Sequence, residues 1–361
     1  MRWNPLTWAP KTQIERAIGL LALVVVALGP LLFNEYWAHQ ILIQTLLFGI
    51  AASSLIFLSA YGGMISLAQT ALFGIAGVII GNLATKGGAG GTSKGLHLGW
   101  DPTLALVLAI VMTTAIGLLF GAVAARSAGI YFLMITLTYS VITTYFLGQV
   151  TIVSGFSGIG GINRYTPGWI GNLIDHPNRL YYIAFGTAVF VYLLIRYLVR
   201  TPFGITLQGL RDEPTRMSSL GYNVALHRTI AFGFAAFVAS LSGVLYVWWS
   251  GQIAPGNVDL PETINLLVMA VIGGLARIEG AWLGAFAFIV IENYVRDISF
   301  PGLGFGGTLF GGSFNTVIGI IFLLIVLISP GGLMGIWERG FALLNRARGS
   351  RSTAETAPAR P

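Results

Sequence analysis

The chain has 361 residues, of which 55% are hydrophobic and only 9% charged, and its mean hydropathy is +0.79. Soluble domains carry about 25% charged residues, so this composition excludes an ordinary soluble globular protein and favours one embedded in a membrane. The net charge of +7 comes from cations scattered through apolar sequence, which cannot form a nucleic-acid-binding face, and the absence of cysteine excludes disulfides and zinc–thiolate sites.

Long runs without a charged residue predict about ten transmembrane helices, because one helical span needs about 20 apolar residues. The runs are continuously apolar rather than alternating, so the predicted fold class is all-α. In chain order the segments cover residues 17–33, two helices within 40–85, 103–125, 127–163, 180–195, 229–258, 263–276, 280–291 and 298–337. The first is expected to be a retained helix, because no small-residue cleavage site follows it.

Glycine pairs mark two places where helices are expected to break. Gly62-Gly63 divides the run 40–85, and Gly273-Gly274 lies near the end of the segment 263–276, just before a tight turn. The segments 263–276 and 280–291 are unusually short, as expected for broken helices beside a transport pathway. A further set of glycines falls on one helix face and predicts close packing rather than ligand binding: Gly74, Gly77 and Gly81.

An even number of spans puts both termini on the same side of the membrane. Of the 20 Lys and Arg residues, five fall in loops on the opposite side: Lys86, Lys94, Arg164, Arg179 and Arg296. The others lie with the termini, which predicts that the termini are cytoplasmic, because positively charged loops stay in the cytoplasm. We therefore expect a multi-pass protein of the inner or plasma membrane, with a cytoplasmic N-terminal lead (1–16), a transmembrane domain (17–337) and a cytoplasmic, disordered tail (338–361).

The one large cytoplasmic loop, residues 200–228, carries the clearest local signals. The pair Thr201-Pro202 predicts the start of a helix of about ten residues. A second helix is expected to start at Asp212, with Glu213-Pro214 in its first turn and Gly221 just past its end. This second helix is amphipathic, with one apolar edge and charged residues beside it. Such a helix can dock into a groove of another protein or lie at the lipid surface, and the residue spacing alone does not decide between these two roles.

Several spaced motifs resemble those of one transporter family. The loop motif 209–216, continued by 219–224, resembles the cytoplasmic coupling segment of branched-chain amino-acid ABC-transporter permeases. Further similar motifs, in the family's order, are residues 61–69, 73–77, 231–246, 272–275 and 329–335. The resemblance covers about residues 15–340 and is to the subunit designated M, and urea permeases are close relatives.

This resemblance implies the permease subunit of an ATP-driven importer for branched-chain or other hydrophobic amino acids. It implies as partners a second permease subunit, usually a different chain, two cytoplasmic ATPase subunits that bind ATP and Mg, and a periplasmic or extracellular solute-binding protein. No cofactor or metal is then expected in this chain. The residues implied at the ATPase contact are Leu210, Arg211, Asp212, Glu213, Arg216, Leu220 and Gly221.

Polar residues within the predicted spans give a mildly polar route for a zwitterionic or amide solute, although each alone is expected to make an interhelical hydrogen bond. They are Ser66, Gln69, Thr70, Thr136, Tyr139 and Asn265. Phe73, Gly273 and Gly274, in the motifs near the helix breaks, complete the candidate translocation path. Glu262 is expected at the outer surface, where its segment begins.

The sequence contains neither a His, Asp and Glu cluster at catalytic or metal-ligand spacing nor a Walker phosphate loop. A membrane enzyme is therefore the weakest alternative, and energy for active transport would have to come from a partner. Two other functions stay open: a urea or short-chain amide ABC permease, and a secondary carrier or channel without an ATPase. An ion-coupled carrier would need ionisable groups inside the membrane, of which the predicted spans hold few.

Overall fold

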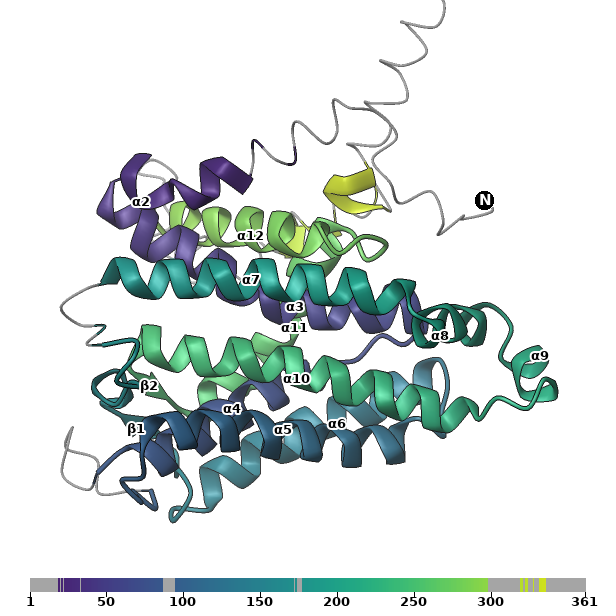
Figure 1. Cartoon of the computed structure of the whole chain (residues 1–361), viewed down its shortest axis with the longest axis horizontal. Coiled ribbons are helices and arrows are strands. Elements are labelled where there is room, and N and C mark those ends of the chain that lie inside the picture. Colours follow the sequence, from purple (N-terminus) through teal and green to yellow (C-terminus); the bar gives the residue numbers. More distant parts are fainter. Residues whose placement is uncertain are drawn as a thin grey trace, which may run out of the picture.

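The computed structural model describes residues 34–86, 95–171 and 177–297, with shorter pieces at 19, 21, 23–32, 173, 319–320, 322–323, 327 and 331–335. A few residues of the predicted first segment, most of the tenth, both terminal regions and the loop 87–94 lie outside the described residues. In the described part the chain is built from helices, apart from one small two-stranded sheet and an isolated bridge (Figure 1). The predicted all-α class is confirmed.

The helices follow the predicted segments. Their bounds are α2 (Gly29–Leu32), the π-helix η2 (Trp37–Leu42), α3 (Ile43–Gly62), α4 (Gln69–Ala84), α5 (Pro102–Ala124), α6 (Ile130–Gln149), α7 (Pro177–Arg200), α8 (Pro202–Asp212), α9 (Pro214–Ser219), α10 (Val224–Ser250), α11 (Leu260–Gly273) and α12 (Gly280–Asp297), with strands β1 (Ile159–Gly160) and β2 (Gln252–Ile253). Within the described residues, five stretches are long and apolar enough to cross a membrane: η2 with α3, α5, α6, α7 and α10.

Of the two segments predicted to be short, α11 has 14 residues, and α12, with 18, continues through the charged residues that ended its uncharged run, although its apolar stretch, Gly280–Tyr294, is shorter than a full span. A third helix, α4, is also short, with 16 residues, because the chain between α3 and α4 is not helical. Counting uncharged residues cannot separate a helix from the irregular chain that leads into it.

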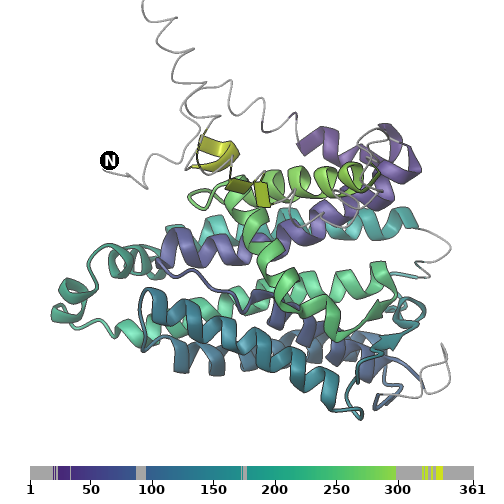
Figure 2. The same cartoon turned by 180° about the vertical axis from the view of Figure 1, so that it is seen from behind.

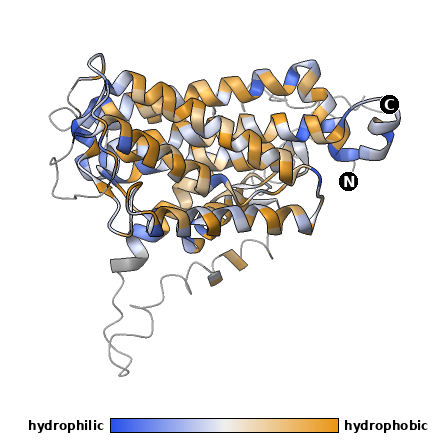
Figure 3. Cartoon of the chain, turned by 90° about the horizontal axis from the view of Figure 1, so that it is seen from below, coloured by the Kyte–Doolittle hydropathy of each residue, from blue (hydrophilic) through white to orange (hydrophobic). Residues whose placement is uncertain are grey.

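Helices α3 and α10 form the centre of the bundle. In the most apolar stretch of each helix, 89% of the residues of η2 with α3 and 72% of those of α10 are buried. The corresponding share is 22–28% for α5, α6 and α7. Glycines let α10 come close to its neighbours: Gly243 lies against the backbone of Phe73 in α4, and Gly117 of α5 lies against Ala236. The outer helices keep apolar residues along their length (Figure 3), as expected for helices surrounded by lipid or by other apolar helices.

The bundle has two distinct ends (Figure 1). We call them the α9 end, where α8 and α9 project, and the β end, where β1 pairs antiparallel with β2. Hydrophilic residues gather at both (Figure 3). The described cations follow the predicted division, with Arg126, Arg196, Arg200, Arg211, Arg216, Arg228 and Arg277 toward the α9 end and Lys86, Arg164 and Arg179 toward the β end.

The α8–α9 segment begins as predicted but divides at a different residue. Thr201 caps α8 with its side chain, and Pro202 is the first helical residue. Asp212 does not start the second helix: it is the last residue of α8, and its carboxylate pairs with Arg211. The break falls at Glu213, which has the extended φ of −144°, because the residue before a proline is disfavoured in helical conformation.

Candidate functional site

A break after α3 lets α4 begin inside the bundle. α3 ends at Gly62, and Gly63 adopts a left-handed backbone, with φ +65°, that turns the chain back on itself. Residues 64–68 are not helical, and α4 starts at Gln69. The Ser54 hydroxyl donates to Gln69 Oε1 at 3.0 Å. Because Ser54 lies more than two turns before the end of α3, α4 begins about 12 Å inside that end.

A second break, after α10, brings the start of α11 to the same place. Gly251, with φ +72°, ends α10, and the chain then returns through β2 and the 3-10 turn η4 (Pro255–Val258). Asp259 caps α11 through its side chain. The Thr263 hydroxyl in the first turn of α11 lies 2.6 Å from the Thr70 hydroxyl in the first turn of α4. The N-terminal ends of the two short helices therefore meet inside the bundle.

A cluster of three hydroxyl groups, Thr70, Thr263 and Ser140 of α6, joins these two ends. The Ser140 hydroxyl lies 2.8 Å from that of Thr263, and the Thr144 hydroxyl donates to the carbonyl of Val258 at 2.9 Å. From this hydroxyl cluster α4 runs toward the β end and α11 toward the α9 end (Figure 2). Helix N-termini carry partial positive charge, and broken helices whose ends point at one place are typical of transport sites inside a bilayer.

Glu262 was expected at the outer surface, and that prediction was wrong. It lies in the first turn of α11, next to the hydroxyl cluster. The uncharged run 229–258 is long enough for a single span, but its last residues, 251–258, fold back toward α4 and α6 as β2 and η4. At a helix N-terminus a carboxylate is stabilised by about 0.3–1 kcal/mol, which favours this position for Glu262.

Four of the predicted path residues come together around the start of α4. Ser66 and Gln69 have no exposed surface, and Thr70 is buried. Thr136 of α6 is also fully buried, and its hydroxyl accepts a hydrogen bond from the backbone N–H of Leu67 at 3.1 Å. Each of these side chains has a protein partner, so in this conformation they hold the non-helical lead-in against its neighbours.

Tyr139 and Asn265 lie apart from that group. Tyr139 donates to the carbonyl of Phe120 in α5 and stacks on its ring, with 4.3 Å between the centroids. Asn265 is half-buried on α11, where its amide donates to Glu262 Oε2 at 3.5 Å. Phe73 lies in an aromatic group next to Tyr246. Tyr139 therefore stiffens the α5–α6 contact, whereas Asn265 and Phe73 flank Glu262 and the start of α4.

The two path glycines lie at the far end of α11. Gly273 meets the backbones of Gly280 and Gly284 in α12, so a Cβ at Gly273 would overlap α12. Gly274, with φ +112°, lies against Gly331. These glycines make the tight turn between α11 and α12 and let the two helices touch, rather than lining an open path.

Ser54, Ser140 and Thr263 were not among the predicted path residues, yet Ser54 joins Gln69 and Thr263 joins Thr70 directly, and Ser140 joins Thr263. A signal for one of them was present in the sequence. Hydroxyl residues recur every fourth position of α6, at 136, 140 and 144, which places them on one helix face. No comparable pattern marks Thr263, because it is the only hydroxyl residue of α11.

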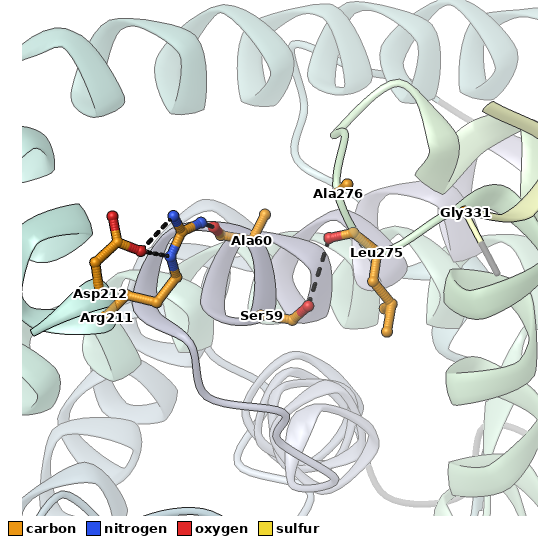
Figure 4. Close-up of a pocket in the computed structure, with 7 residues that line it drawn as sticks. All are labelled: Ser59, Ala60, Arg211, Asp212, Leu275, Ala276 and Gly331. Atoms are coloured by element: carbon orange, nitrogen blue, oxygen red, sulfur yellow. Dashed lines mark hydrogen bonds and ion pairs between the residues drawn. The ribbon is translucent and has the colours of Figure 1, made fainter. Parts of the chain in front are cut away.

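A cavity of about 560 Å³ lies at the α9 end, beneath α8 (Figure 4). Its lining comes from the end of α3, the end of α8, the α11–α12 turn and one more glycine: Ser59, Ala60, Arg211, Asp212, Leu275, Ala276 and Gly331. Arg211 donates from Nη1 to the carbonyl of Ala60, and from Nε and Nη2 to Asp212 at 2.8 and 2.7 Å. Its aliphatic chain lies against Gly63, where any side chain would displace it.

The other predicted coupling residues divide into a buried and an exposed set. Leu210 is 1% exposed and fixes the end of α8 to the bundle. Glu213, Arg216, Leu220 and Gly221 are exposed, and α9 buries none of its residues. α9 is therefore free to contact another surface, while α8 is tied to α3 through Arg211.

A polar network connects α7 to the α11–α12 turn at the same end. The Tyr192 hydroxyl donates to Glu279 at 2.9 Å and accepts from Arg196 Nη1 at 2.8 Å. Because α7 leads directly into α8, the same helix, α7, holds both the α11–α12 turn and the start of the α8–α9 segment. Among the residues that the structure describes, no group of three or more His, Cys, Asp or Glu is placed to hold a metal ion.

Comparison with known proteins bears on this arrangement. The family model for the branched-chain amino acid transport system permease component matches residues 38–328. The LivM permease protein of the high-affinity branched-chain amino acid transport system of Escherichia coli is 26% identical over 216 residues, covering 54% of this chain and 51% of the relative. The match thus spans about half the length of that relative.

Two other relatives are matched over more of their length. A probable LivM branched-chain amino acid transport permease protein of Methanocaldococcus jannaschii is 25% identical over 63% of this chain and 68% of the relative. The BraD permease protein of the high-affinity branched-chain amino acid transport system of Pseudomonas aeruginosa is 25% identical over 64% of this chain and 74% of the relative. No solved structure matches. The family match includes both short helices and the α8–α9 segment.

Proposed function

The chain belongs to the family of branched-chain amino-acid transport permeases, and from this premise we propose that it is the permease subunit of an ATP-driven importer of branched-chain or other hydrophobic amino acids. The observation that carries the proposal is the family match over residues 38–328, together with the long apolar helices of a multi-pass membrane protein. The importer is proposed to lie in the inner or plasma membrane.

In this proposal the α9 end faces the cytoplasm, with both termini, and the β end faces outward. The excess of arginine at the α9 end supports this orientation. Two ATPase subunits, which bind ATP and Mg, contact α9 and the end of α8 through Asp212, Glu213, Arg216, Leu220 and Gly221. A solute-binding protein docks at the β end, and this chain needs no cofactor of its own.

The tie between α8 and α3 suggests how nucleotide binding acts on the site. Arg211 links the end of α8 to the carbonyl of Ala60 and packs on Gly63, where the lead-in to α4 begins. A shift of α8 would therefore pull on the same residues that place Gln69 and Thr70. A partner shifts such an equilibrium only by its differential affinity for the two states, so the ATPase and the binding protein must each prefer one.

A second permease subunit is proposed to cover the face of α11. Helix α11 lies at the front of the bundle in Figure 2, between α12 and α6. Asp259 is exposed there, and Glu262 and Asn265 are half-buried. Ionisable and polar groups at membrane depth face protein or a water-filled path rather than lipid, so this face supports a pathway between two permease subunits.

Uptake by the assembled complex tests the proposal. The chain is expressed with its partner permease, ATPases and binding protein, reconstituted in vesicles, and given labelled leucine, isoleucine, valine or urea. We expect amino-acid uptake that stops when ATP is removed while the ion gradient is held. Uptake that persists without ATP and collapses with a protonophore would identify a secondary carrier instead, and import of urea alone would identify a urea permease.

A further inference from the structure

A narrow cavity lies beside the hydroxyl cluster, between α3, α4 and α11. Its volume is about 10 Å³, enough for one water-sized group. Phe48 and Phe73 line it on the apolar side, and Thr70, Asn257 and Glu262 supply polar atoms. It is thus a small space that combines aromatic rings with a carboxylate, at the point where the N-terminal ends of α4 and α11 meet.

Two rings, Phe48 and Phe73, line this space, and a third, Tyr246, packs against both of them. The centroids of Phe48 and Phe73 are 6.3 Å apart, and Tyr246 lies 5.0 Å from Phe73 and 5.9 Å from Phe48. The Tyr246 hydroxyl accepts a hydrogen bond from Asn257 Nδ2 at 3.1 Å, which holds the ring in place. Aromatic faces attract cations, and the attraction is stronger when water is excluded. Aromatic rings and a carboxylate together attract a cationic group, and an ammonium group is the cation that such a site binds in preference to neutral or anionic groups.

The polar end of the cavity can be reached from outside the bundle. Glu262 is half-buried, and the preceding residues Asp259 and Leu260 are exposed. They belong to the start of α11, the helix that is proposed to border the pathway (Figure 2). A carboxylate inside a membrane span is costly; Glu262 is stabilised there by the N-terminal end of α11 and by the Asn265 amide, and an ammonium group beside it would stabilise it further.

We infer that Glu262 and the rings of Phe48 and Phe73, which Tyr246 holds in place by packing against them, form a subsite for the ammonium group of the transported solute. The ammonium group enters the space that one water molecule would fill, and the rest of the solute stays on the open side of α11. This inference rests on the proposed function and narrows it. The solute class is one with a protonated primary amine, such as a zwitterionic amino acid, and not urea, a neutral amide or a carboxylic acid.

Binding of two leucine fragments tests the subsite. 3-Methylbutylamine keeps the ammonium group and 4-methylpentanoate keeps the carboxylate. Their dissociation constants are measured by equilibrium dialysis on the permease–ATPase complex in nanodiscs, without the solute-binding protein. We expect the wild-type complex to bind the amine at least tenfold more tightly than the acid. Glu262→Gln should reduce that ratio to within twofold of one, and Glu262→Asp should keep part of it.

Asp259→Asn is the matched control. It removes the same charge three residues away, and Asn caps a helix as well as Asp does, so the tenfold ratio should persist. Equal binding of amine and acid to the wild type, no binding of the amine, an unchanged ratio in Glu262→Gln, or an equal loss in Asp259→Asn would each overturn the subsite.

Measuring ATP-driven leucine uptake by the same complex distinguishes a failure of the ammonium subsite from a failure of the proposed importer function. Uptake without any preference for the amine would overturn the subsite alone. A preference for the amine that Glu262→Gln removes, in a complex that shows no ATP-dependent uptake, would support the subsite and overturn the proposed importer.

Discussion

The breaks before α4 and before α11 deliver two helix ends to one place, but they are held from opposite ends of the bundle. The first is made by Gly63 and is covered by Arg211 of α8, at the α9 end. The second is made by Gly251, whose carbonyl accepts a hydrogen bond from the Ile162 N–H at 3.0 Å, and is continued by the β1–β2 pair at the β end. The first break is therefore stabilised by contacts at the α9 end, and the second by contacts at the β end.

This difference suggests that partners at the two ends of the bundle control different breaks. A partner that moves α8 acts on the lead-in to α4, and a partner that moves the β1 loop acts on the lead-in to α11. The two motions meet where Thr70 and Thr263 join. If the comparison holds, damage to one break should impair the response to one partner and leave the response to the other.

The largest effect is expected from Arg211→Glu. A glutamate cannot donate to the Ala60 carbonyl and places a second negative charge beside Asp212, so α8 should lose its tie to α3. We expect uptake to fall to background while the protein still inserts into the membrane, measured by vesicle uptake and by the amount of purified complex. Arg126→Glu, an exposed charge reversal at the same end, should keep most of the uptake. Normal uptake by Arg211→Glu would remove α8 from the mechanism.

A matched pair of alanine substitutions tests the comparison itself. Gly63→Ala and Gly251→Ala both put a Cβ on a left-handed residue, at a cost of about 1–2 kcal/mol. Gly63→Ala also displaces Arg211, whereas Gly251→Ala meets the side chain of Asn163.

Both variants should lose about tenfold in uptake, but for different reasons. ATP hydrolysis in Gly63→Ala should respond weakly to the docked binding protein, because the substitution lies at the α9 end, where the ATPase is proposed to bind. Gly251→Ala should need a higher binding-protein concentration for half-maximal uptake. The same defect in both variants would contradict the proposal that the α9 end and the β end control different breaks.

The sequence predicted the first break and not the second, for a physical reason. Gly62-Gly63 interrupts an uncharged run that is too long for one helix, so the run had to be divided. The run 229–258 needed no division, because 30 residues fit one tilted span. Asp259 and Pro261 are good helix-start residues, but Glu262 beside them was expected at the outer surface. Only the fold places the start of α11 next to the start of α4.

Thr263→Val should have a smaller effect than either glycine change. Valine keeps the shape but removes the hydroxyl that joins Thr70 to Ser140, and buried membrane hydrogen bonds contribute about 0.6 kcal/mol each on average. We expect the complex to unfold a few degrees lower in a thermal scan and uptake to fall about threefold. Thr263→Ser, which keeps the hydroxyl, should match the wild type. A loss as large in Thr263→Ser would assign the effect to packing.

The site was predictable in part because hydroxyl and amide residues in apolar helices are few. Ser66, Gln69, Thr70 and Thr136 were predicted from the sequence and lie around the start of α4, while their part in a path stays a prediction. Tyr139 was chosen by the same rule but donates to α5, because composition cannot say which face of α6 looks inward. Partners distant in sequence, such as Ser54 and Gln69, are fixed only by the lead-in that reverses the chain.

The smallest effect is expected from Asp212→Asn, and it decides what Arg211 does. The Asp212 side chain is 60% exposed, and exposed ion pairs contribute about 0–1 kcal/mol. Asparagine still accepts a hydrogen bond from Arg211, so the guanidinium should stay on the Ala60 carbonyl and uptake should change less than twofold, measured alongside Arg211→Glu. A loss close to that of Arg211→Glu would mean that the ion pair, rather than the grip on α3, carries the motion from α8 to the start of α4.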